Sequence, residues 1–235
     1  MALQILARKM LMVTLVCVTF AASPSFAAEG GQRKDDLSFF GARTIAQGQT
    51  ALWLTAGLPD VEIGALYGLS TLADFSPTVR FNYGRGLRIG GGGATATARF
   101  RMKFAETHGW TIAVSGEPGL TLHLSAQDHP PTTSAGAQSV VLTPIAGAIT
   151  ADRLLTPSLR LNVGLRAAVG FFLVPESLVH TPIQGQVGVE LHVTKDLFLL
   201  AQVDLGVDLY SQYSAPVSDA SRFFTRVRLG LAWAR

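Results

Sequence analysis

The segment Ala94-Thr-Ala-Thr-Ala-Arg-Phe-Arg-Met-Lys-Phe104 alternates without a break between apolar and polar residues. Alanine, phenylalanine and methionine occupy its even-numbered positions, and threonine, arginine and lysine occupy its odd-numbered positions. A β-strand sends successive side chains to opposite faces, whereas a helix would scatter both kinds around its circumference. The segment therefore predicts a strand with one apolar face and one charged face.

The same period of two continues along most of the chain. It is clearest in residues 159–171, 187–193, 199–209 and 223–233, with shorter stretches at 61–67, 79–83, 110–114 and 120–124. The last two stretches share one parity, which predicts a single strand through the Gly116–Gly119 interruption. The series predicts an all-β fold, an antiparallel up-and-down barrel of about ten strands over residues 47–235, with eight strands as the alternative.

Two stretches and one run of glycines are harder to place. Residues 49–57 fit either parity. Residues 139–151 are apolar on both faces, and Pro144 argues against a central strand there. Gly90–Gly93 is followed by no Lys-Ser/Thr pair and no helix signal, so we expect a flexible hairpin connection rather than a phosphate-binding loop.

The first 27 residues have the composition of an export signal. A basic start precedes the apolar run Met10–Ala22, and small residues follow at Ser25 and Ala27. The run is shorter than the roughly 20 residues that a membrane-spanning helix needs. We therefore predict a signal peptide over residues 1–27 and, because no period is visible there, a flexible periplasmic leader over residues 28–46.

Composition narrows the class of protein further. Hydrophobic residues make up 48% of the chain and charged residues 15%, and the single cysteine lies within the predicted signal. Past residue 27 no stretch approaches the roughly 18 consecutive apolar residues of a spanning helix. Removing the signal takes two of the 19 basic residues and none of the 16 acidic ones, which leaves 17 against 16. No basic excess remains that would predict binding to nucleic acid.

Alternation alone also fits a soluble periplasmic lipocalin-like binder, which would turn its apolar face inward. Glycine recurs on the polar face, however, and aromatic residues fall near strand ends: Tyr67, Trp110 and Trp233 at one end, Tyr83 and Phe223 at the other. Such aromatic girdles are typical of barrels that span the outer membrane. We therefore expect a transmembrane barrel in the bacterial outer membrane, monomeric, with membrane lipid and the export and barrel-assembly machinery as partners.

The expected connections differ in length. Those at 70–76, 106–109, 152–157 and 194–196 are tight, whereas those at 126–138 and 211–221 are long and polar. Outer-membrane barrels have short periplasmic turns and longer extracellular loops. The pattern places both termini in the periplasm.

Two short phrases carry a family resemblance. Tyr67-Gly-Leu-Ser-Thr-Leu-Ala-Asp-Phe75 resembles the strand–turn–strand phrase of small Gram-negative outer-membrane barrels of the opacity-protein-like group. His192-Val-Thr-Lys-Asp-Leu-Phe-Leu199 is similar to a second periplasmic hairpin of that kind. The resemblance implies architecture only, from about residue 48 onward. Such barrels usually finish on an aromatic residue, whereas here Ala234 and Arg235 follow Trp233.

The polar face supplies the candidate site, a charge network lining the lumen. Its predicted members are Glu62, Arg80, Arg99, Arg101, Lys103, Arg160, Arg166, Glu190, His192, Asp204, Asp208, Arg226 and Arg228. Neighbouring strands should pair Asp204 and Asp208 with the last two arginines. Such a network predicts a salt-bridged plug and a structural or passive role. The alternative is a narrow porin-like pore, which the excess of basic residues would make anion-leaning.

An outer-membrane hydrolase, either a protease or a lipid A-modifying enzyme, is a further alternative. Its rim candidates would be His129, His180, Asp208, Tyr210 and Asp219. No nucleophile motif accompanies them, and the histidines lack metal-ligand spacing. We therefore predict no catalytic residue, metal or cofactor.

Overall fold

The computed structural model describes residues 37–85, 88–123, 139–174, 178–212 and 220–234, and the predicted signal peptide lies outside them. The strands in these ranges are β1 Thr50–Leu58, β2 Asp60–Gly68, β3 Ala73–Arg85, β4 Arg88–Thr107, β5 Trp110–Gly116, β6 Gly119–His123, β7 Ser139–Leu154, β8 Leu159–Val174, β9 Leu178–His192, β10 Leu197–Gln212 and β11 Ala220–Ala234. Within these ranges, no helix has the length and apolar character needed to cross a membrane.

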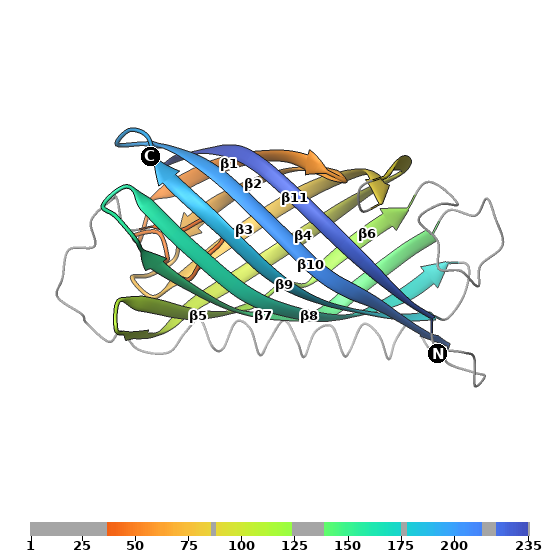
Figure 1. Ribbon diagram of the computed structural model, residues 1–235. Coiled ribbons are helices and arrows are strands. Elements are labelled where there is room, and N and C mark those ends of the chain that lie inside the picture. The colour runs from red at the N-terminus through yellow and green to blue at the C-terminus, as the bar shows by residue number, and fades with distance from the viewer. Residues whose placement is uncertain (1–36, 86–87, 124–138, 175–177, 213–219, 235) are drawn as a thin grey trace. The chain divides into compact units, whose positions relative to one another are not determined.

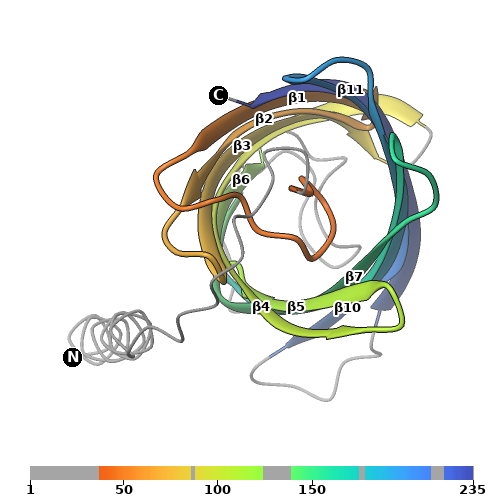
Figure 2. The ribbon, with the colours of Figure 1, turned by 90° about the vertical axis from the view of Figure 1, so that its left-hand side faces the viewer.

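The strands form one closed antiparallel sheet (Figures 1 and 2). Apart from β5 and β6, consecutive strands pair with each other, and β1 also pairs with β11 from Ala51↔Ala234 to Leu58↔Val227. β5 and β6 both lie between β4 and β7, so they occupy a single position in the ring. The ring therefore has ten positions, which confirms the ten-stranded barrel and the single strand through Gly116–Gly119.

The apolar face of each strand points outward. On β4, Arg101 is 2% exposed whereas Phe100 is 43% exposed and Phe104 is 73% exposed. The other strands follow this rule, with buried Asp, Glu, Asn, Gln and Arg side chains inside and exposed Leu, Ile, Val and Phe side chains outside. A lipocalin-like binder needs the reverse arrangement, so that alternative is wrong.

Strand β7 changes parity along its length. Val141 is buried on one side of Pro144, and Ala146 and Ala148 are buried on the other. The register with β8 shifts between Leu142 and Ile145, which marks a bulge. Proline, which cannot donate to a ladder, is tolerated at a bulge. The bulge explains why the sequence looks apolar on both faces.

The predicted connection at Gly90–Gly93 is wrong, because these glycines lie inside β4. Gly93 pairs with Asn82 of β3 and with His123 of β6. Glycine keeps its backbone N–H and C=O groups, so a ladder can run through it. The connection between β3 and β4 falls instead at residues 86–87, which are not among the described residues.

The two ends of the barrel differ. The chain enters β1 and leaves β11 at one end, which we call the termini end, and the turns 69–72, 108–109, 155–158 and 193–196 lie there. At the opposite end, the loop end, the hairpin turn at Pro59 joins β1 to β2, and most of the predicted long loops at 126–138 and 211–221 lie beyond the described ranges. Strands β1 and β2 have only nine residues each, fewer than most of their neighbours.

Candidate functional site

Residues 37–46 lie inside the barrel, and we call this segment the plug. Figure 2 shows it crossing the interior of the ring. Leu37, Phe39 and Ile45 are at most 2% exposed. These residues belong to the stretch for which the sequence predicted a flexible leader. The first part of that stretch, 28–36, is not described, whereas its last part fills the lumen.

Two buried carboxylates bind the backbone of the plug. Glu190 Oε1 accepts hydrogen bonds of 2.9–3.0 Å from the Ser38 hydroxyl and from the N–H groups of the next two residues. Asp152 Oδ2 accepts the N–H groups of residues 42 and 43 at 2.6 and 2.7 Å. The plug forms no strand, so these side chains satisfy donors that a ladder would otherwise pair.

Arginines of β4 bind the plug's carbonyl groups. Arg101 Nη1 donates to the Gly41 oxygen at 2.7 Å, and Arg99 Nη2 donates to the Phe39 oxygen at 3.0 Å. Arg101 is itself paired with Asp74, whose Oδ2 lies 2.5 Å from Nη2. The plug is therefore held by hydrogen bonds to both its donors and its acceptors.

The apolar side of the plug packs against the few apolar residues of the inner face. The Phe39 ring lies 5.1 Å from that of Phe198 and 6.2 Å from that of Trp53, with edge-on geometry. A Cβ on Gly64 would lie 2.2 Å from the indole carbon Cζ2, so glycine is required beside this ring. Trp53, Leu66 and Phe198 thus break the polar pattern because they receive the plug.

Six residues next to the plug form a closed ring of alternating charge, which we call the charge ring. Its order is Arg80, Asp60, Arg226, Asp204, Arg228 and Glu62. Each carboxylate bridges two guanidinium groups, at N···O distances from 2.5 to 3.6 Å. The ring joins β2 and β3 to β10 and β11 across the inner face of β1. Because every charge has two partners of opposite sign, the ring can remain ionised while buried.

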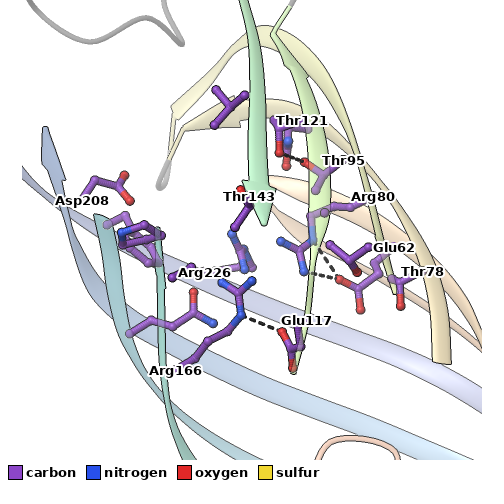
Figure 3. A pocket seen from close by; sticks show the side chains of 18 of the residues that line it. Glu62, Thr78, Arg80, Thr95, Glu117, Thr121, Thr143, Arg166, Asp208 and Arg226 are labelled. Carbon is purple, nitrogen blue, oxygen red and sulfur yellow. Dashed lines mark hydrogen bonds and ion pairs between the residues drawn. The ribbon is translucent and has the colours of Figure 1, made fainter. Parts of the chain in front are cut away.

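A cavity of about 260 Å³ occupies the interior beside the charge ring (Figure 3). Arg80, Arg166 and Arg226 project into it from three strands, with Arg166 bound to Glu117 at 2.7 Å. Six threonines also line it: Thr78, Thr95, Thr97, Thr121, Thr143 and Thr225. The cavity is polar and can hold water or a small polar ligand.

The other wall of the cavity is aromatic. The His180 ring stacks on Tyr210 with centroids 4.8 Å apart, and Phe172 lies 6.4 Å from His180. His180 Nε2 lies 3.0 Å from Asp208 Oδ1. Three of the hydrolase candidates thus meet, although no serine or threonine hydroxyl of the described residues is hydrogen-bonded to His180. His129 and Asp219 are not described, and in the described ranges no three potential metal ligands gather.

The structure distributes the predicted lumen residues over three groups. The charge ring contains Glu62, Arg80, Asp204, Arg226 and Arg228. Contacts around the plug involve Arg99, Arg101, Arg160, Glu190 and His192, the last through its ring 4.0 Å from Phe198. Arg166 and Asp208 lie in the cavity wall. The expected pairing of Asp208 with Arg226 or Arg228 is not observed: these arginines pair with Asp60, Asp204 and Glu62, and Asp208 lies 3.0 Å from His180.

Lys103 is the exception among these residues. It pairs with Glu106 at 3.3 Å near the end of β4, where Glu106 is exposed. This pair contacts neither the plug nor the charge ring. It lies at the termini end, beside the turn at 108–109.

Sequence reasoning missed four carboxylates of the lumen and the plug itself. These carboxylates are Asp60, Asp74, Glu117 and Asp152. Parity with Glu62 and Arg80 would have identified the first two, whereas the β7 bulge and the β5–β6 interruption obscured the others. Among the described residues, these four carboxylates match the excess of basic over acidic side chains in the predicted set, which removes the basis for the expected anion preference.

No protein-family model matches the chain, and no curated protein matches it. Among solved structures, it is similar to outer-membrane expressed OmpT of Vibrio cholerae, with 10% identity, a TM-score of 0.35, and coverage of 75% of this chain and 56% of that one. In-vitro folded OmpT of that organism gives 11% identity, a TM-score of 0.36, and coverage of 91% and 71%. The chain thus spans just over half the length of the first structure. At these TM-scores the likeness carries no argument about family or activity.

Proposed function

We propose that this chain is an integral protein of the bacterial outer membrane, with both termini in the periplasm and a lumen that the plug closes to solutes. Its role is then structural and passive toward transport, with a cavity on the loop-end side of the plug. The single observation that carries this proposal is the plug, which is hydrogen-bonded to Glu190, Asp152 and Arg101 and packed on Phe198.

The outer surface supports the membrane location. Large apolar side chains are exposed around the whole barrel, including Leu229 at 65% and Ile145 at 61%. A contiguous apolar surface of this kind is unfavourable in water and typical of a barrel in lipid. Tyr67 and Trp233 are exposed near the termini end and Phe223 near the loop end, as interfacial aromatic residues would be.

The short connections support the orientation. The two hairpins that resemble those of opacity-type barrels turn at 69–72 and 193–196, both at the termini end. Short turns face the periplasm in such barrels. Insertion by the barrel-assembly machinery from the periplasm is consistent with this orientation.

Fractionation and solute flux test the proposal together. The protein should float with outer-membrane vesicles and migrate differently on a gel before and after heating. Liposomes containing it should not swell in small sugars, because the plug leaves no continuous path. A soluble, heat-insensitive protein would overturn the membrane location, and sugar-dependent swelling of liposomes with the wild type would overturn the closed lumen.

A further inference from the structure

The barrel wall is incomplete above the β1–β2 hairpin. The last pair between β1 and β11 is Leu58↔Val227, and the first pair between β2 and β3 is Asp60↔Asn82. Beyond these pairs, Ala220–Arg226 of β11 is paired only with β10, and Gly84–Arg85 of β3 only with β4. No strand of the described residues fills the space between them. We call this space the side opening.

The cavity extends to the side opening. Its lining includes Pro59 at the hairpin turn, Asn82 at the edge of β3, and Thr225 at the edge of β11. Thr225 has the parity of the outward residues Phe223 and Val227, whereas its neighbours in the sequence point inward. An outward-facing residue can line a cavity inside the barrel where no neighbouring strand covers it. As far as the described residues are concerned, the cavity is therefore accessible from the side of the barrel.

Apolar and aromatic residues flank the side opening on the outside. Phe223 of β11 is 73% exposed, and Phe81 of β3 is 55% exposed. An unpaired strand edge is costly in hydrocarbon but tolerable among head groups, where exposed aromatic residues concentrate. In the membrane location proposed above, the opening would lie at the membrane–water interface, with an apolar surface below it and a polar cavity behind it.

Among the described arginines that line the cavity, Arg99 has no carboxylate within ion-pair distance. The charge ring is internally balanced, Arg166 is paired with Glu117, and Asp208 is bonded by His180. Arg99 contacts the Phe39 carbonyl and the face of Trp53, 6.0 Å away, and its buried Nε has no hydrogen-bond partner in the structure. A guanidinium group in this setting favours an anion that can accept its remaining donors.

We propose that the cavity binds the anionic head of a membrane amphiphile, a phosphate-bearing lipid whose acyl chain leaves through the side opening along Phe81 and Phe223. The head lies against Arg99 and among the threonine hydroxyls. The cavity volume suits a head group rather than a whole lipid, because pockets for drug-sized ligands are at least about 300 Å³. This inference rests on the membrane location proposed above.

Three probes separate the head from the tail. Lysophosphatidic acid carries both, glycerol 3-phosphate is the head alone, and a monoacylglycerol of the same chain length lacks the phosphate. Binding is measured by calorimetry on the full-length protein folded in a neutral detergent, after the heat-dependent gel shift has shown that the barrel is formed. We expect lysophosphatidic acid to bind at least about tenfold more tightly than either part.

Two pairs of variants test the two halves of the site. Arg99→Gln should weaken lysophosphatidic acid binding about tenfold, since it removes a charged hydrogen-bond donor. Thr150→Val, which removes a different bond to the plug, from the Thr150 hydroxyl to the Gly41 oxygen, should leave binding unchanged. Thr225→Trp should obstruct the side opening and weaken binding, whereas Thr181→Trp, on the outer face of β9, should not.

The outcomes are distinguishable. Equal affinity for glycerol 3-phosphate and lysophosphatidic acid would overturn the membrane source and leave a site for soluble anions. No binding of either, or unchanged binding in Arg99→Gln, would overturn the inference while the barrel itself stands. Failure to insert into membranes would instead overturn the proposed location on which the inference rests.

Discussion

At the scale of single residues, Glu190 is central because three donors of the plug converge on one of its oxygens. Glu190→Ala should lower the free energy of unfolding by about 3 kcal/mol, since buried donors lose their acceptor. Urea unfolding of the protein folded in detergent measures the change. Glu106→Ala, at an exposed ion pair, should cost no more than about 1 kcal/mol. Equal losses in the two variants would contradict the role given to Glu190.

The charge ring makes a second prediction at this scale. Asp204→Ala leaves Arg226 and Arg228 each without one of two partners, so it should destabilise the barrel by about 3–5 kcal/mol. Asp208→Ala, on the same strand but paired with a partly exposed histidine, is the matched control and should cost less. A larger loss in Asp208→Ala would show that the ring is not the main electrostatic cross-link. Urea unfolding of the two variants folded in detergent measures both losses.

At the scale of elements, the bulge in β7 sets which residues face the lumen. Deleting Pro144 would remove the extra residue and move Val141 and its strand neighbours to the opposite face, because a shift of one residue inverts a strand. The deletion variant should lose most of its heat-modifiable form on gels. Pro144→Ala keeps the bulge and should fold. Wild-type folding of the deletion variant would contradict the assignment of the bulge.

The elements also show what the sequence can predict. The strand around Arg99 and Arg101 was evident because its alternation is unbroken over eleven residues, 94 to 104. Gly90–Gly93 was misassigned because a strand of glycines has no side-chain pattern, and the register with β3 shifts beside Gly93. In β7 the inward-facing positions change from odd to even numbers at the bulge, so the alternation of apolar and polar residues is not visible in the sequence. Local irregularities of the backbone, rather than weak propensity, limited the prediction.

The plug could not be predicted for a different reason. Its residues have no period, because a segment that crosses a lumen meets a different neighbour at every step. The available signal was indirect: Trp53, Leu66 and Phe198 are large apolar residues on a face that otherwise carries charges. Apolar residues on an inner face imply an apolar occupant, and Phe39 and Ile45 are the occupant here.

At the scale of the whole molecule, the lumen is divided into a filled half and an open half. The plug fills the termini end, the charge ring braces the wall where β1 is short, and the cavity faces the loop end and the side opening. In the function proposed above, a barrel so divided offers solutes no continuous path. It can still offer a ligand site to the membrane and to the exterior.

The balance of lumenal charge gives a prediction at this scale. The four carboxylates that the sequence analysis missed match the basic excess it had counted. A lumen freed of the plug should therefore discriminate only weakly between K⁺ and Cl⁻, since neither sign of fixed charge dominates. Reversal potentials across a salt gradient measure this selectivity. A strongly anion-selective current would restore the anion-leaning pore.

The central claim, a barrel closed by its own residues 37–46, is tested most directly by single-channel recording in planar bilayers. Wild-type protein should show no resolved openings, and a variant lacking residues 37–46 should show stable openings once its gel shift has confirmed a folded barrel. Resolved openings in the wild type, or a folded deletion variant that stays silent, would contradict the account.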